Sequence, residues 1–114
     1  MITIEKLTDF GANVQEGLSR CYGNEALYFR LVNMIPAEGN FDKLKAAIEA
    51  NDLTAGFEAA HALKGVLGNL SLTSMYTVCS EMTELLRART EMDYTPMLTE
   101  LLGMRDTLAA LCAT

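Results

Sequence analysis

The sequence has no tryptophan, only two prolines and a single histidine, His61, among its 114 residues. Proline ends helices, so its scarcity leaves long stretches free to be helical. No segment alternates polar residues with β-branched apolar ones, as a half-buried strand would. The apolar half of the chain consists mainly of leucine, alanine and methionine, which are good helix formers. These features predict an all-α protein.

Basic residues are also few: nine Lys and Arg stand against fifteen Asp and Glu, for a net charge of −6. An acidic chain without a basic stripe argues against binding to nucleic acid or to an anionic membrane surface. No apolar run is long enough for a transmembrane helix. Residues 1–6 are too polar for a signal peptide. We therefore expect a cytoplasmic protein that contacts neither nucleic acid nor membrane.

Metal and nucleotide chemistry have little support. The three cysteines, Cys21, Cys79 and Cys112, form no CxxC pair, and a zinc site needs more ligands than one histidine and scattered thiols supply. No glycine-rich phosphate-binding loop is present. The pair Glu81 and Glu84 has the spacing of a solvated helix face rather than of a catalytic dyad. We expect no metal and no cofactor.

Helical spacing of apolar residues recurs along the whole chain. One pattern covers residues 4–21 and is interrupted near Gly11. The next begins at Asn24, ends at Pro36 and should bury Leu27, Leu31, Met34 and Ile35. Further helices are expected after Asn40, from Thr54 to Leu70, after the turn at residues 71–74, and from Thr95-Pro96 onward. The pattern predicts one domain, residues 1–114. Its expected fold is an antiparallel up-down-up-down four-helix bundle with one or two short N-terminal helices.

His61 lies on the polar side of its helix. At 100° per residue, Leu63, Val66, Leu67 and Leu70 fall about 120–180° away from it and define the buried face. Gly65, Gly68 and Phe57 fall within about 40° of His61, and Lys64 within about 60°. Each glycine inside a helix costs about 1 kcal/mol relative to alanine. Glycines at these positions could allow tight helix packing or mark a frayed helix end. Because they share a face with His61 and Lys64, we favour a third interpretation, that they leave room for a partner to approach an exposed imidazole.

An exposed histidine beside a lysine suits phosphoryl transfer. Neutral imidazole is a competent nucleophile toward phosphorus near pH 7. Lys64, one turn after His61, can place its ammonium beside the phosphate oxygens. The chain has no convincing acidic cluster for Mg²⁺, so the metal and the acceptor aspartate would have to come from the partner.

The stretch from Phe57 to Leu70, FEAAHALKGVLGNL, resembles the signature of histidine-containing phosphotransfer (HPt) domains. Residues 79–87 also resemble the helix that follows in that family. The resemblance implies a phosphorelay carrier without kinase activity of its own. His61 would accept a phosphoryl group from an aspartyl phosphate on a receiver domain and pass it to another receiver. Lys64 would neutralise the phosphate, and Gly65 would leave room for the partner.

The same resemblance implies a partner surface around His61. Phe57, Glu58 and Gly68 would contact the partner, and Thr83 on the next helix would support the imidazole or the phosphate. The implied partners are response-regulator receiver domains, which would carry the Mg²⁺, and a hybrid histidine kinase. We expect a monomer. Ser71 departs from the family, which commonly has glycine there, and should alter only the turn.

Two other functions remain open at this stage. A helical adaptor would bind receiver domains through the same surface without being phosphorylated, and His61 would then be incidental. An acyl carrier is suggested by Leu70-Ser71-Leu72, but the aspartate expected before the modified serine is absent.

Overall fold

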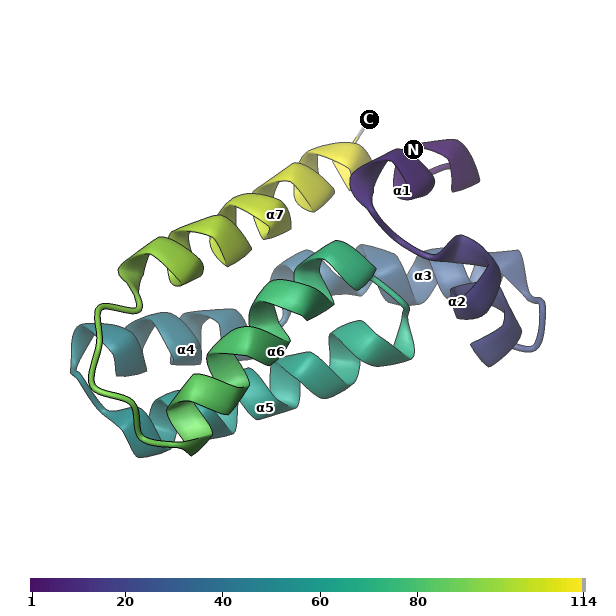
Figure 1. The fold of residues 1–114 in the computed structure, drawn as a ribbon. Helices are drawn as coiled ribbons and strands as arrows, with labels where there is room; N and C mark the ends of the chain where they lie inside the picture. The colour runs from purple at the N-terminus through teal and green to yellow at the C-terminus, as the bar shows by residue number, and fades with distance from the viewer. Residues whose placement is uncertain (114) are drawn as a thin grey trace.

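The computed structural model describes residues 1–113, which form helices and no strand. The all-α class is confirmed. The elements in chain order are α1 (Ile4–Phe10), α2 (Val14–Arg20), α3 (Glu25–Met34), the 3₁₀ turn η1 (Ile35–Ala37), α4 (Asn40–Glu49), α5 (Leu53–Asn69), α6 (Thr73–Arg87) and α7 (Thr95–Ala113) (Figure 1).

The longer helices lie alongside one another. After short turns, α5 runs back along α4, and α6 runs back along α5 (Figure 1). The last helix, α7, packs against α6, α4 and η1. Because α3 and α4 follow each other nearly in line, separated only by η1, the molecule is elongated, with extents of 41 × 25 × 20 Å (Figure 1).

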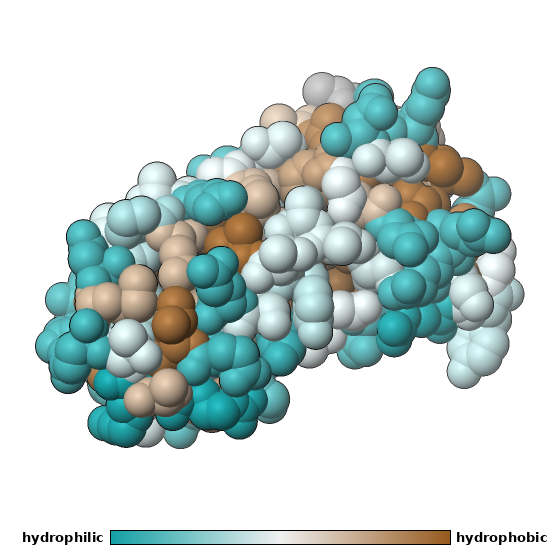
Figure 2. Space-filling view, in the orientation of Figure 1, coloured by the Kyte–Doolittle hydropathy of each residue, from teal (hydrophilic) through white to brown (hydrophobic). Residues whose placement is uncertain are grey.

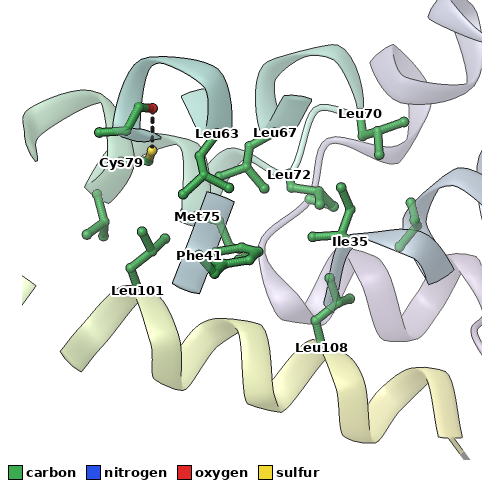
Figure 3. Packing of buried hydrophobic residues seen from close by; sticks show 14 of the residues in the cluster. Ile35, Phe41, Leu63, Leu67, Leu70, Leu72, Met75, Cys79, Leu101 and Leu108 are labelled. Carbon is green, nitrogen blue, oxygen red and sulfur yellow. Dashed lines mark hydrogen bonds between the residues drawn. The ribbon is translucent and has the colours of Figure 1, made fainter. Parts of the chain in front are cut away.

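One apolar core joins these helices. Figure 3 shows the labelled side chains of α4, α5, α6 and α7 converging on a common interior. The residues without measurable exposure include Leu44, Leu63, Leu67, Leu72, Met75, Met82, Leu101 and Leu108. Burial of each such side chain contributes about 1.5–3 kcal/mol before the entropy of ordering is subtracted. Of the stripe expected on the His61 helix, Leu63, Leu67 and Leu70 are buried and Val66 is half-buried.

The N-terminal helices close one end of the α5–α6 pair. The predicted interruption at Gly11 is confirmed, and its φ of +107° is one that glycine adopts without strain. The backbone N–H of Asn13 donates to the carbonyl of Ser71 at 2.9 Å, and the hydroxyl of Ser74 donates to the carbonyl of Phe10 at 3.0 Å. The turn between α5 and α6 is therefore held by α1 and α2.

The predicted buried face of α3 is partly wrong. Ile35 is buried as expected, but Met34 is 62% exposed and Leu27 and Leu31 are only half-buried. The side chains that enter the core from α3 are Tyr28 and Val32, both fully buried. Tyr28, Val32 and Ile35 share one helix face, at positions i, i+4 and i+7, and this is the face that is buried. The ring of Tyr28 packs against Gly17, where a Cβ would lie only 2.4 Å from the ring.

Candidate functional site

The helix that carries His61 begins at a well-formed cap. The carboxylate of Asp52 accepts a hydrogen bond from the backbone N–H of Ala55 at 3.0 Å, which satisfies one free donor of the first turn. From there α5 runs for 17 residues and buries Ala59, Ala60 and Leu63. This fixes the rotation of the helix, and His61 is exposed on the opposite side, as the sequence predicts.

One face of the imidazole is covered by Phe57. The two ring centroids are 5.5 Å apart and the planes are inclined by 17°, which is an offset stack. The guanidinium carbon of Arg87, from the end of α6, lies 4.9 Å from the centroid of the same phenyl ring. The ring of Phe57 therefore contacts both a cation and the imidazole, and His61 remains exposed to solvent.

Lys64 is placed beside His61 but already has a partner. Its Nζ lies 3.6 Å from Oε1 of Glu84 on α6, and its side chain is 24% exposed. The other carboxylate oxygen of Glu84, Oε2, accepts a hydrogen bond from Nε of Arg87 at 3.1 Å. One carboxylate thus bridges Lys64 and Arg87.

The two glycines on the His61 face differ in their surroundings. A Cβ built on Gly65 meets no atom within 4 Å, so this position is open to an approaching molecule. A Cβ on Gly68 would lie 3.2 Å from Cε2 of Tyr76, because the half-buried tyrosine ring of α6 packs over it. The expected clearance therefore exists at Gly65, whereas the space at Gly68 is used by the protein itself.

His61, Lys64 and Gly65 border a hollow of about 600 Å³, which we call the His61 hollow. Its opposite wall is formed by Asn13, Glu16 and Arg20 from the second N-terminal helix and its cap. Arg20 and Glu16 form an ion pair at 3.5 Å. The hydroxyl of Ser71 donates to Glu16 at 2.8 Å, so this serine does more than shape the turn: it ties α2 to the end of α5.

Thr83 does not lie where the resemblance implied. It is fully buried, and its hydroxyl donates to the backbone carbonyl of Cys79 at 2.7 Å. In this structure the hydroxyl of Thr83 is therefore directed at the backbone of its own helix, and its side chain is not on the surface. The surface position facing Lys64 is taken instead by Glu84, one residue later.

Glu58 is exposed and stands away from the His61 hollow. It lines a separate shallow depression together with Asn40 and Lys43 of α4. Its expected contact with a partner stays a prediction.

The cysteines are unsuited to nucleophilic roles. Cys21, Cys79 and Cys112 are all free thiols, and the first two are buried. Burial raises the pKa of Cys79 to about 11, and its Sγ donates to the carbonyl of Ala60 at 3.3 Å, the dashed line in Figure 3. Within residues 1–113 no three His, Cys, Asp or Glu side chains gather as metal ligands would.

Sequence reasoning missed Glu84, Arg87 and Arg20 as neighbours of the His61 site. The i, i+3 spacing of Glu84 and Arg87 signalled a helical ion pair, but not that it faces Lys64. Arg20 carries no local signal, because the packing of α2 against the α5–α6 turn brings it to the hollow.

Of the helices within the described residues, none combines the length and hydrophobicity needed to span a membrane. The family model described as Hpt domain matches residues 36–114. No curated protein and no solved structure gives a significant match.

Proposed function

Because the chain belongs to the Hpt domain family, whose members carry phosphoryl groups in phosphorelay signalling, we propose that His61 is the phosphoacceptor. The observation that carries the proposal is the setting of His61 itself. It is exposed, stacked on Phe57, one turn from an ammonium and next to the open position at Gly65. The proposal takes α4 to α7 as the antiparallel up-down-up-down bundle on which this site is presented.

The donor would be an aspartyl phosphate on a receiver domain. The lone pair of a neutral imidazole nitrogen forms the new P–N bond while the bond between phosphorus and the aspartyl oxygen breaks. The electron pair of that bond returns to the aspartate as carboxylate. The ring, which keeps the proton on its other nitrogen, becomes a phosphorylated imidazolium. Transfer to a second receiver reverses these steps.

Lys64 would supply the charge that this reaction needs from the carrier. Phosphoryl transfer depends mainly on positioning and on neutralising the phosphoryl oxygens. With no acidic cluster for Mg²⁺ among the described residues, the proposal assigns the metal to the receiver. Gly65 would let the receiver's active site approach the imidazole edge, and Phe57 would both hold the ring and contact the partner.

The surface suits brief contacts. The large apolar side chains that are well exposed, such as Met1, Tyr22, Met34 and Met92, are far apart in the sequence, and of these four only Met34 lies in a helix. The face in Figure 2 is mostly hydrophilic to intermediate, and its hydrophobic groups lie apart, the larger one where the end of α7 meets α1. Stable obligate partners use larger apolar areas, so we propose transient docking to receiver domains and to a hybrid histidine kinase.

A phosphotransfer assay tests the proposal. A receiver domain phosphorylated on its aspartate, with Mg²⁺ present, is mixed with the wild-type chain or with His61→Gln. We expect acid-labile, base-stable label on the wild type alone, and an unchanged helical circular-dichroism spectrum for the variant, since the side chain is exposed. Receivers that bind the wild type without transferring label would contradict the carrier role and favour the adaptor function.

A further inference from the structure

Two cations, Lys64 of α5 and Arg87 of α6, are held by a single carboxylate. Glu84 offers Oε1 to Lys64 at 3.6 Å and Oε2 to Arg87 at 3.1 Å. Arg87 in turn lies over Phe57, which stacks on His61. The contacts therefore form a chain of five side chains, Lys64–Glu84–Arg87–Phe57–His61, and its two ends lie one helical turn apart on α5.

With Glu84 present, these side chains carry one net positive charge rather than two before any phosphoryl group arrives. Lys64 and Arg87 bring two positive charges and Glu84 brings one negative charge. A phosphoryl group on His61 adds about two negative charges near Lys64. The ammonium of Lys64 carries a single positive charge, and a phosphoryl group would share that charge with Glu84.

We propose that Glu84 is a positioning residue that competes with the phosphoryl group for Lys64 and thereby limits the stability of phosphohistidine. This inference rests on the proposed function. In the unphosphorylated protein Glu84 keeps the ammonium on the α6 side of the site. After transfer, Lys64 turns toward the phosphoryl oxygens, and Arg87 retains Glu84. Weak stabilisation suits a carrier, because the phosphoryl group must leave again for a second receiver.

The exposure of Glu84 also explains why Lys64 can leave it for the phosphoryl group at little cost in free energy. Its side chain is 56% exposed, so the carboxylate is solvated when the ammonium moves away. The ion pair at 3.6 Å is loose, and exposed pairs of this kind are weak. A tight, buried pair would instead lock Lys64 away from the phosphate.

The test measures an equilibrium rather than a rate. The chain is allowed to exchange label with a receiver domain, and the ratio of phosphohistidine to aspartyl phosphate is read at equilibrium. The affinity of the chain for the receiver changes how fast this ratio is reached. It does not change the ratio itself, as long as the two proteins are mostly dissociated. We expect Glu84→Gln to shift the ratio toward phosphohistidine by about two- to fivefold, the range of a weak ion pair. The shift should shrink as salt is raised.

Two controls separate this role from a general charge effect. Glu100→Gln removes one negative charge from an exposed position on α7 and should leave the ratio unchanged. In a Lys64→Met background, Glu84→Gln should produce a markedly smaller shift. An equal shift with and without Lys64, or no shift beyond that of Glu100→Gln, would overturn the inference. If the wild type takes up no label, the proposed function fails and the inference fails with it.

Discussion

The phenyl ring of Phe57 and the imidazole of His61 are stacked, with centroids 5.5 Å apart and planes 17° from parallel. The two residues are one helical turn apart, so the contact is built into α5 itself and needs no other element. An exposed histidine would otherwise sample several rotamers. The stack restricts the ring and presents its edge to a docking partner.

Replacement of Phe57 should therefore slow transfer without unfolding the protein. Aromatic pairs contribute about 0.5–1.5 kcal/mol beyond area burial, which corresponds to roughly a two- to tenfold loss of rate for Phe57→Leu. Phe57→Tyr keeps the aromatic ring and should transfer at nearly the wild-type rate. The measurement is the single-turnover rate of label transfer from a receiver. Equal rates for the leucine and tyrosine variants would show that stacking has no part in positioning His61.

The two glycines give a matched pair of substitutions. Gly65→Ala should raise the free energy of unfolding by up to about 1 kcal/mol, because the new methyl group meets no atom and alanine favours the helix. The same methyl group should slow transfer, since it occupies the space proposed for the partner. Stability is read from urea denaturation, and transfer from the receiver assay.

Gly68→Ala should behave differently. Its Cβ would stand 3.2 Å from the ring of Tyr76, so Tyr76 must shift and the gain in helix propensity is partly lost. Transfer should be affected less than in Gly65→Ala. If Gly68→Ala slows transfer more strongly than Gly65→Ala, the partner also needs the space at Gly68. The proposal that only Gly65 leaves room for the partner would then be wrong.

Tyr28 should make the protein less stable at high pH. Burial, together with the nearby Cys21, raises the pKa of Tyr28 to about 12 from its ordinary value of 10.0. The folded state therefore holds this proton more tightly than the unfolded chain does. The resulting stabilisation is complete below pH 10 and is lost as the pH rises from about 10 to 12.

Tyr28→Phe isolates this contribution. The variant loses the hydrogen bond from the hydroxyl to the carbonyl of Leu70, 2.9 Å long, and should be about 1 kcal/mol less stable at pH 7. Its free energy of unfolding should fall less steeply than that of the wild type between pH 10 and 12. Parallel pH profiles for the two proteins would contradict the assignment to Tyr28.

Much of the candidate site could be predicted because its key contacts are local. His61, Phe57, Lys64 and Gly65 lie on one helix within three turns, and the 100° step of the helix fixes which of them share a face. The capping signals at Asn24 and before Pro96 are equally local, and the helices begin within a residue of where those signals place them. The resemblance implies Thr83 beside the site, whereas the structure has Glu84 there, because a step of one residue rotates a side chain by 100°, from the surface into the core.

By itself, the sequence determined the helical class, the exposed histidine and the cation one turn away, since each follows from residue type and helical periodicity. Only the tertiary structure decided what surrounds them. The docking of α6 on α5 brought Glu84 to Lys64 and Arg87 to Phe57. The packing of α2 at the end of α5 placed Arg20 across the His61 hollow, and Tyr76 filled the space over Gly68. These contacts join residues on different helices, and their geometry depends on how the whole core packs, which no local pattern encodes.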